Sequence, residues 1–331
     1  MLIAYEIFNV KRRYVNCTFA VISVNKNTNI TMTFKKDLII GLSKKNKSIP
    51  SKYHYDLKGS KFFEKITKQK EYYPTRKEKE ILKKISKEIP KLFNGKLSYV
   101  ELGSGAIDKI KLLINKDVKY YVPLDISLDY VKKSVKKLKK QYPKIKIKPK
   151  KIDYSKHFKI PNLKETTKVY FFLGSSIGNF HNKEEVKFLR KLRKSINKNN
   201  YLFIGVDLIK NKQILDKAYN DKKGYTAKFS LNLINIINRT QKTNLNINNF
   251  YYHGYYNTKL RCIHGFLVSK INQNFKIGNK KFFLKKSERI LVEISNKFTI
   301  QSFTKLASNT GWTTKRVWLD KQKYYSLFLL K

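Results

Sequence analysis

The sequence predicts an α/β protein with a parallel β-sheet and crossover helices, a C-terminal antiparallel hairpin, and an inserted α+β subdomain. Three observations predict this class. Short β-rich runs alternate with amphipathic stretches from about residue 77 to residue 209, which is the pattern of a parallel sheet with crossover helices. This alternation fails between residues 210 and 296. Two strand-like runs, separated by a polar turn, then end the chain.

The alternating region supplies the elements of the predicted parallel sheet. Its strands are short apolar runs, and its helices carry apolar residues at spacings of three and four. The candidate strands lie at residues 98–102, 119–124, 145–148, 168–173 and 200–206. The candidate helices lie between them, at about residues 106–115, 127–141 and 183–197.

The remainder of the chain has a different pattern. An Asn-rich helix near residues 226–239 precedes strand-like segments around residues 260–268 and 281–296, and the polar residues 243–250 indicate a loop. These segments predict the inserted subdomain. A helix near residues 300–310 is followed by TTKRVWL and YYSLFLL, which predict the closing hairpin.

The charge of the chain is strongly positive, with 73 Lys and Arg against 23 Asp and Glu and a formal net charge of +50. Clustered basic residues bind polyanions, so a basic nucleic-acid-binding protein is one alternative. However, 64 of the basic residues are Lys and 9 are Arg, and the excess Lys accompanies excess Asn, Ile, Tyr and Phe, which A/T-rich codons also encode. We therefore interpret the charge as a solvated Lys surface and expect no nucleic-acid partner.

The two cysteines, Cys17 and Cys262, form neither a disulfide framework nor a metal-binding spacing. They indicate a cytoplasmic protein without a metal site. No apolar run approaches the length of a membrane span, so we expect no membrane partner, and we expect a monomer. Residues 1–31 predict an extension outside the core, because Met32 opens a stretch that continues into the rest of the protein. The extension is either a weak leader or the result of a start called upstream of Met32.

A glycine turn follows the first candidate strand, in the run SYVELGSGAIDK at residues 98–109. A strand, glycines and a helix place backbone N–H groups at the carboxyl edge of a sheet, where nucleotide cofactors bind. The dinucleotide fingerprint has a third glycine, but here Asp108 follows Gly103 and Gly105. Asp108 would repel a pyrophosphate, which argues against NAD and FAD. A tight turn without a ligand stays open as an alternative.

Acidic residues near this turn favour a ligand that has ribose hydroxyls and a positive charge. Glu101 precedes the turn, and Asp125 ends the next strand. Asp153 and Tyr154 follow the third strand, where an acid can accept a hydrogen bond from an adenine amino group. S-adenosylmethionine has ribose hydroxyls, a positive charge and an adenine amino group, so we predict it as the cofactor.

The end of the fourth strand predicts where a methyl acceptor approaches. The run FFLGSSIGNF at residues 171–180 places small and polar residues there, which leave room for a substrate beside the methyl group. DNA and RNA amine methyltransferases usually carry an Asp or Asn, two prolines and an aromatic residue at this point. This sequence has no such run.

With these residues identified, the sequence resembles the histidine-specific Nα-methyltransferase family, the S-adenosylmethionine enzymes that open ergothioneine biosynthesis. The resemblance runs from about residue 37 to the C-terminus. It rests on blocks in the family's order, which are YDLKGSKFFEKIT, EYYPTR, ELGSGAIDK, FFLGSSIGN, GVDLIK, AYND, GYTAKF and VEISNKF. The resemblance implies a Rossmann-like class I methyltransferase sheet and Nα-methylation of L-histidine, up to trimethylhistidine (hercynine).

The resemblance also implies the roles of individual residues. The positions that match cofactor contacts are Gly103, Lys109, Asp125, Asp153, Tyr154 and Ser176, the last where the family usually has Thr. The positions that match substrate contacts are Tyr55, Tyr72, Asn179, Tyr219, Glu293 and Ser295. Among these, Tyr55 and Asn179 are the expected catalytic residues, and no metal ligand is implied.

The chemistry of the substrate positions suits histidine. An imidazole presents one N–H donor and one acceptor nitrogen, and Glu293 and Ser295, two residues apart on a strand, lie on one face where they can contact both edges. Asn179 and Tyr219 offer neutral donors to the carboxylate of an amino acid. The rings of Tyr55 and Tyr72 can enclose its amine.

The resemblance gives a division of the chain. Residues 1–31 form the N-terminal extension, and the methyltransferase domain is expected to contain residues 77–209 and 297–331. The substrate-binding subdomain is expected to contain residues 32–76 and 210–296.

One departure from the family bears on the substrate. The family commonly carries a Glu-Met pair where this chain has His264 and Gly265, and the missing Met side chain predicts a larger pocket. Methylation of another amino acid or a related amine is therefore the alternative within the same class of enzyme.

Overall fold

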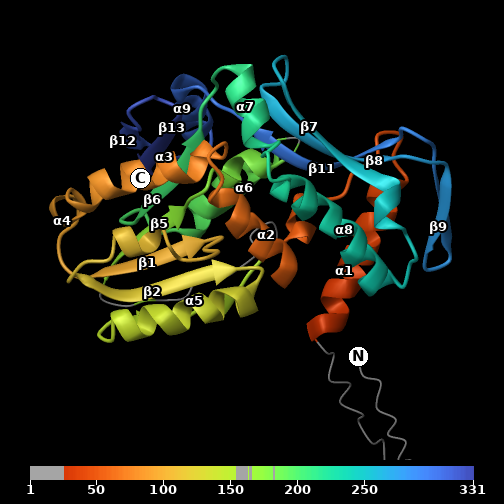
Figure 1. Ribbon diagram of the computed structural model, residues 1–331. Helices are drawn as coiled ribbons and strands as arrows, with labels where there is room; N and C mark the ends of the chain where they lie inside the picture. The colour runs from red at the N-terminus through yellow and green to blue at the C-terminus, as the bar shows by residue number, and fades with distance from the viewer. Residues whose placement is uncertain (1–25, 154–162, 164–165, 182) are drawn as a thin grey trace, which may run out of the picture.

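The computed structural model describes residues 26–153, 163, 166–181 and 183–331. In this part of the chain the strands form a main sheet, a second sheet and a separate two-stranded hairpin. Figure 1 shows the main sheet on the left and the second sheet on the right, with helices packed around both. The predicted α/β class, with a second antiparallel sheet, is therefore confirmed.

The main sheet has eight strands in the order β12-β13-β6-β5-β1-β2-β3, with β4 also paired to β2. Neighbouring strands from β6 through β3 run parallel, whereas β13 runs antiparallel to both β6 and β12. The strands are β1 (Leu97–Leu102), β2 (Val118–Asp125), β3 (Lys146–Ile147), β4 (Lys150–Lys151), β5 (Thr167–Phe172), β6 (Tyr201–Asp207), β12 (Thr314–Leu319) and β13 (Tyr325–Leu330). All six residues of β1 and of β13 are buried, as expected of central strands covered on both faces.

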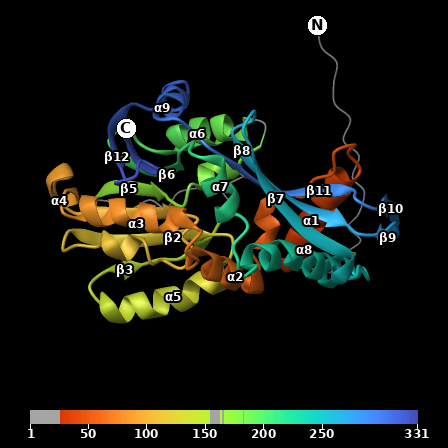
Figure 2. The same ribbon diagram turned by 45° about the horizontal axis from the view of Figure 1, so that its top comes forward.

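Helices cover both faces of the main sheet. Apolar residues of α3 (Tyr73–Ser86), α4 (Ile89–Leu92) and α5 (Leu128–Gln141) pack with one face in a single cluster. Residues of α6 (Glu184–Ser195) and α9 (Ile300–Ser308) pack on the other face. Figure 2 shows these two helical layers on opposite sides of the strands.

The second sheet has its own core. Its strands β7 (Phe250–Asn257), β8 (Cys262–Ser269) and β11 (Arg289–Asn296) are antiparallel in the order β11-β8-β7. Their apolar side chains pack against α1, α8 and the hairpin of β9 and β10. The bounds of these four elements are α1 (Lys26–Leu42), α8 (Tyr225–Gln241), β9 (Gln273–Ile277) and β10 (Lys280–Leu284).

The remaining helices are short. They are η1 (Ser51–His54), α2 (Leu57–Thr67), η2 (Ile110–Leu112), η3 (Ser176–Asn179), α7 (Lys212–Ala218) and η4 (Ile247–Asn249). The helix α2 packs on α8 of the second sheet and also contacts α3 and α5 of the main sheet, so it bridges the two parts (Figure 1).

Some predicted elements differ from the structure. The helix predicted at residues 106–115 is wrong, because this segment forms turns and the single 3₁₀ turn η2. Ile107 has φ 64°, a left-handed conformation that an α-helix does not accommodate. The predicted strand at residues 145–148 is reduced to the two-residue β3. The strands β7 and β9 were not predicted, and α1 crosses the expected boundary at residue 31.

A buried ion pair joins the two sheets where β6 ends. Lys297, which follows β11, places Nζ 2.9 Å from Oδ2 of Asp207, and both side chains are almost fully buried. Lys210 approaches the other oxygen of Asp207 at 2.5 Å. The backbone reinforces the junction, since Phe298 N–H donates to the Asp207 carbonyl at 3.1 Å. Asp207, the last residue of β6, therefore binds the segment that directly follows β11 of the second sheet.

We predict that Asp207→Asn destabilises the protein strongly. The change leaves the buried ammonium groups of Lys210 and Lys297 without a carboxylate, and breaking a buried pair in this way costs about 3–5 kcal/mol. Urea unfolding at neutral pH measures the loss. Asp129→Asn is the matched control, because the Asp129 side chain is 91% exposed and its pair with Lys132 is loose at 3.7 Å. Equal stability of the two variants would contradict this account of the junction.

Candidate active site

The glycine turn lies at the carboxyl edge of the main sheet and is held by Asp125. Gly103 and Gly105 have φ values of 69° and 53°, which glycine adopts without strain. Asp125 ends β2, and its two carboxylate oxygens accept hydrogen bonds from Gly105 N–H at 2.9 Å and Ser127 N–H at 2.8 Å. Each oxygen keeps a lone pair that a ribose hydroxyl can use. Burial raises the pKa of Asp125 above its ordinary value.

Glu101 does not contribute to this edge in the way the sequence suggested. It is 2% exposed, and its carboxyl group accepts a hydrogen bond from the Tyr121 hydroxyl at 2.5 Å. Burial raises the pKa of Glu101 to about 8. The side chain is therefore an interior group beneath the glycine turn.

Lys109 is anchored beside the turn by Glu78, a residue of α3. Lys109 Nζ lies 2.6 Å from Oε2 of the fully buried Glu78. The other oxygen of Glu78 accepts from Gly174 N–H at 2.8 Å and from the Tyr325 hydroxyl at 2.7 Å. One carboxylate thus fixes α3, the last strand, the loop after β5 and the cation at the glycine turn.

The loop after β5 connects the two sheets at the candidate site. Ser175 has φ 55°, and its hydroxyl accepts from Asp207 N–H at 2.9 Å. Ser176 donates to the Leu173 carbonyl at 3.0 Å, and Asn179 ends η3.

Gly178 of η3 lies close to β11. A Cβ on Gly178 would lie 2.7 Å from the Asn296 carbonyl oxygen and 3.4 Å from Ser295 Oγ. The glycine therefore lets η3 approach β11 closely.

Asp153 follows β4 at the same edge of the main sheet. Its carboxylate lies 3.3 Å from Lys52 Nζ, which comes from η1, and β4 is paired with β2 at Asp125. Tyr154, the neighbouring residue that the sequence analysis assigned to the cofactor, lies outside the described residues.

Ser295 and Tyr219 form a hydrogen-bonded group with Lys297. The Tyr219 hydroxyl donates to Ser295 Oγ at 2.9 Å, and Lys297 Nζ donates to Ser295 Oγ at 2.7 Å and to Tyr219 at 3.0 Å. Both acceptor positions of the Ser295 hydroxyl are therefore in use. The group that remains for a ligand is the O–H of Ser295, which is a donor.

Glu293 lies two residues before Ser295 on β11 and on the same face of the strand. Within the described ranges, no residue donates a hydrogen bond to its carboxyl group. Burial raises the pKa of Glu293 to about 8, although the nearby charge of Lys297 acts in the opposite direction. The carboxyl group is thus largely protonated at neutral pH and is available to a ligand.

Aromatic rings connect the remaining substrate positions to this group. Tyr72 meets Tyr219 edge to face at 6.2 Å between ring centroids, and Phe63 meets Tyr72 at the same separation. Tyr55 packs edge to face on Phe63 at 5.7 Å and on Phe229 at 5.3 Å. The structure therefore joins Tyr55, Tyr72, Tyr219 and Ser295 in one continuous set.

Asp207 carries the negative charge that balances the buried ammonium groups of Lys210 and Lys297. Burial alone would raise the pKa of Asp207, but Lys297 and Lys210 outweigh it and hold this pKa below its ordinary value. Burial lowers the pKa of Lys210 to about 8, which the negative charge of Asp207 opposes. The Tyr73 hydroxyl also donates to Asp207 at 2.8 Å. Asp207 is accordingly an ionised structural group.

The space beside Gly265 differs from the sequence-based expectation. A Cβ on Gly265 would lie 2.8 Å from Glu293 Cβ and 3.1 Å from two atoms of the Tyr252 ring and hydroxyl. Tyr252 comes from the neighbouring strand β7 and occupies this position. The missing side chain at residue 265 therefore leaves no open volume there.

Several residues of this site were not identified from the sequence as site residues. They are Glu78, Asp207, Lys210, Tyr252 and Lys297. Asp207 and Lys210 fall in the quoted block GVDLIK, and Lys297 falls in VEISNKF. The motifs marked these segments, but charged side chains alone did not reveal that the segments meet.

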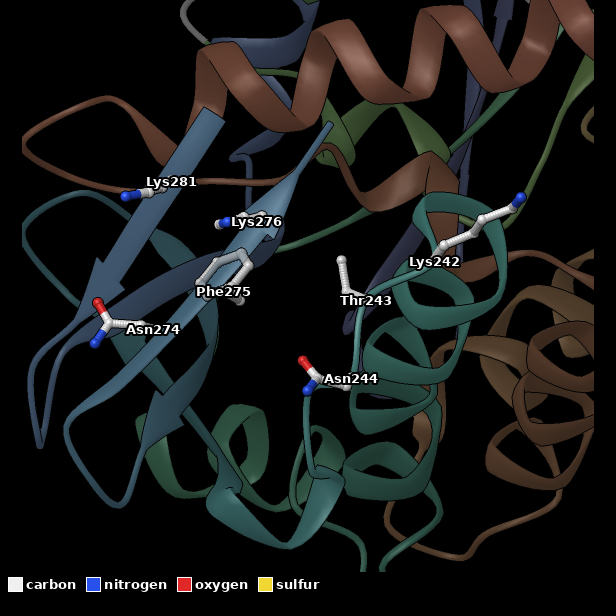
Figure 3. Close-up of a pocket in the computed structure, with 7 residues that line it drawn as sticks. All are labelled: Lys242, Thr243, Asn244, Asn274, Phe275, Lys276 and Lys281. Atoms are coloured by element: carbon white, nitrogen blue, oxygen red, sulfur yellow. The ribbon is translucent and has the colours of Figure 1, made fainter. Parts of the chain in front are cut away.

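A hollow of about 620 Å³ lies elsewhere, between the end of α8 and the hairpin of β9 and β10 (Figure 3). Its lining residues are Lys242, Thr243, Asn244, Asn274, Phe275, Lys276 and Lys281. The three lysines are exposed, and none of the residues above contributes to it. We therefore assign it no role in the reaction.

In the part of the chain that the structure describes, no cluster of three or more His, Cys, Asp or Glu side chains could hold a metal ion. Within the same residues, no helix combines the length and apolar character needed to cross a membrane.

The sheet order, the glycine turn at the carboxyl edge and the acid that ends β2 define an S-adenosylmethionine-dependent methyltransferase of the Rossmann-like class. The family model described as "Histidine-specific methyltransferase, SAM-dependent" matches residues 34–331. The chain therefore belongs to this family of N-methyltransferases, whose members include proteins of ergothioneine biosynthesis.

The curated proteins to which the chain is similar include three from different organisms. The histidine N-alpha-methyltransferase of Mycobacterium tuberculosis is 29% identical over 90% of this chain and 94% of that protein. Ergothioneine biosynthesis protein 1 of Schizosaccharomyces pombe is 30% identical over 76% of this chain and 35% of that protein. The L-tryptophan methyltransferase trpM of Psilocybe serbica is 25% identical over 86% of this chain and 88% of that protein.

We predict that Asp125→Ala weakens the binding of S-adenosylmethionine. The change removes the carboxylate that is positioned for the ribose hydroxyls, and hydrogen bonds to a charged group contribute roughly 1.5–3 kcal/mol, which corresponds to a 10- to 150-fold rise in Kd. Calorimetric titration measures it. The control is Asp108→Ala, an exposed residue of the same turn. An unchanged Kd for the Asp125 variant would reject the assignment.

Proposed function

We propose that the protein methylates the α-amino group of L-histidine with S-adenosylmethionine and that it carries the reaction to trimethylhistidine. The observation that supports this most is the pair on β11. Glu293 presents a carboxyl group without a partner among the described residues, and Ser295 presents a hydroxyl whose acceptor positions are filled. The pair therefore offers one acceptor and one donor, at a spacing of two residues on one strand.

A neutral imidazole complements this pair. Its N–H donates to an ionised Glu293, and its other nitrogen accepts from the Ser295 hydroxyl. An imidazolium has two donors and no acceptor, so it would leave the Ser295 O–H unpaired. A phenyl or alkyl side chain would leave both groups unpaired, which costs binding free energy in a buried site.

The other residues of the set can hold the rest of the amino acid. Asn179, at the end of η3, offers an amide donor to the α-carboxylate. The hydroxyl proton of Tyr219 is directed to Ser295, so Tyr219 contributes by orienting Ser295 and would have to turn to reach the carboxylate. Tyr55 and Tyr72 place aromatic rings beside the amine, where their faces stabilise the cation that methylation produces.

The residues at the carboxyl edge of the main sheet fit S-adenosylmethionine. Asp125 suits the ribose hydroxyls, Asp153 suits the adenine amino group, and Lys109 suits the carboxylate of the methionine part. Gly103 and Ser176 line the turns beside it, and we assign Tyr154 to the same ligand. When bound, S-adenosylmethionine supplies an activated methyl group on a sulfonium centre.

The reaction needs a neutral amine aligned with the methyl group. Before each transfer the ammonium group loses a proton to solvent, and the neutral nitrogen then forms a bond to the methyl carbon as the carbon–sulfur bond breaks and its electron pair goes to sulfur. Holding the two reactants in line supplies much of the rate. Tyr55 and Asn179, which would contact the amine and carboxylate, are the catalytic residues in this proposal.

Several features of the proposal extend beyond the family assignment. The amine stays nucleophilic until it is quaternary, which allows three successive transfers. We also propose that the protein acts as a monomer in the cytoplasm, with residues 77–209 and 297–331 binding the cofactor and residues 32–76 and 210–296 binding the substrate. Another amino acid as substrate is the alternative within the family, where trpM is described as an L-tryptophan methyltransferase.

We predict that histidine binds more tightly as the pH rises from 6.5 through 8 and that the affinity levels off near pH 9. Glu293, with a pKa of about 8 in the free protein, must lose its proton to accept the ring N–H. The affinity therefore changes by up to tenfold per pH unit below that pKa. Calorimetry in the presence of S-adenosylhomocysteine, which prevents turnover, measures the profile.

Glu293→Gln should remove this pH dependence and lower kcat/KM for histidine by roughly 10- to 150-fold, since one charge-assisted hydrogen bond is lost. Glu288→Gln is the matched control, because Glu288 lies just before β11 and pairs with Lys47 instead. A Glu293 variant with the wild-type profile and kcat/KM would contradict the proposed function.

A further inference from the structure

The hydroxyl group of Tyr252 is buried and has no hydrogen-bond partner among the residues that the structure describes. A tyrosine hydroxyl in the interior normally finds a partner. Leaving it unpaired destabilises the protein. An unpaired hydroxyl in the interior does not stabilise the fold. Its position relative to the candidate site is therefore informative.

Two glycines on neighbouring strands make room for the Tyr252 ring. Gly254 of β7 and Gly265 of β8 are directly paired across the ladder. A Cβ on Gly254 would lie 2.4 Å from the Tyr252 hydroxyl oxygen, and a Cβ on Gly265 would lie 3.1 Å from it. Side chains at these two positions would displace the Tyr252 ring, so the two glycines leave space for its hydroxyl group.

The glycine pair also places the Tyr252 hydroxyl beside the substrate residues. Glu293 of β11 is paired with Gly265 of β8, and a Cβ on Gly265 would lie 2.8 Å from Glu293 Cβ. Burial raises the pKa of Tyr252, and the nearby groups that raise it further are Glu293, Tyr219 and Asp221. The unpaired Tyr252 hydroxyl and the Cβ of Glu293, whose carboxyl group has no donor among the described residues, therefore lie over the same glycine.

We propose that Tyr252 is a specificity-determining residue, whose hydroxyl hydrogen-bonds the polar edge of the substrate side chain next to Glu293. This inference rests on the proposed function for the location of the substrate. It adds a third polar group, from β7, to the pair on β11. The bound side chain then satisfies a hydroxyl that the free protein leaves without a partner.

The test is Tyr252→Phe, which removes one oxygen and keeps the ring that packs over the glycines. The loss of one neutral hydrogen bond predicts a roughly 3- to 10-fold fall in kcat/KM for histidine. The ratio of kcat/KM for histidine to that for phenylalanine should fall by the same factor, because phenylalanine makes no such bond. The melting temperature should be unchanged or higher, since a buried unpaired group is removed.

Tyr251→Phe is the matched control, because Tyr251 is the preceding residue of β7 and its side chain is 45% exposed. It should leave kcat/KM and the ratio unchanged. A Tyr252 variant whose ratio lies within twofold of the control would overturn the inference. A lower melting temperature with an unchanged ratio would also overturn it, because that result assigns Tyr252 a structural role.

The outcomes separate this inference from the histidine assignment. If the wild type methylates histidine and Tyr252→Phe leaves the ratio unchanged, the Tyr252 inference fails and the proposed function stands. If the wild type instead prefers another amino acid with a polar side chain, the same ratio is measured with that substrate against phenylalanine. A fall in that ratio supports the role of Tyr252 although histidine is excluded.

Discussion

The buried pair of Asp207 and Lys297 is the interaction on which the site depends. Asp207 is the last residue of the central strand β6, and Lys297 follows the edge strand of the second sheet. The same ammonium group that pairs with Asp207 also donates to Ser295 and Tyr219. The contact that fixes one sheet against the other therefore also sets the hydrogen-bond polarity of the proposed substrate residues.

Two carboxyl groups near this junction, the buried Asp207 and the half-buried Glu293, have opposite electrostatic surroundings. Asp207 faces two ammonium groups, which hold its pKa below the ordinary value in spite of burial. Burial raises the pKa of Glu293 to about 8, and no described residue donates to it. Environments that separate the pKa values of neighbouring acids are a means of assigning them different tasks. Here Asp207 stabilises the fold, and Glu293 is the acid that we propose binds the substrate.

The local parts of the fold were predictable from the sequence, whereas the junction was not. The runs that became β1, β2, β5 and β6 are apolar and short, and the glycines at the end of β1 marked the turn. The helix predicted at residues 106–115 failed because the left-handed backbone at Ile107 has no clear sequence signature in a non-glycine residue. The pairing of Asp207 with Lys297 joins segments that are far apart in the chain, so no local pattern could predict it.

The candidate site was likewise predictable from the sequence only in part. The family motifs marked Glu293, Ser295 and Tyr219 individually, but only the three-dimensional contacts show that Ser295 is left with a donor. The sequence suggested a larger pocket at Gly265, since a side chain is missing there. The structure places the Tyr252 ring in that space, and this contribution from a neighbouring strand depends on the register between β7 and β8.

The identity of the methyl acceptor is tested most directly by incubating the purified protein with S-adenosylmethionine and each of the twenty amino acids and measuring the products by mass spectrometry. The account predicts that histidine gains one, two and then three methyl groups and that it is methylated in preference to every other amino acid. Methylation of an amino acid without an imidazole, with histidine left unchanged, would contradict it.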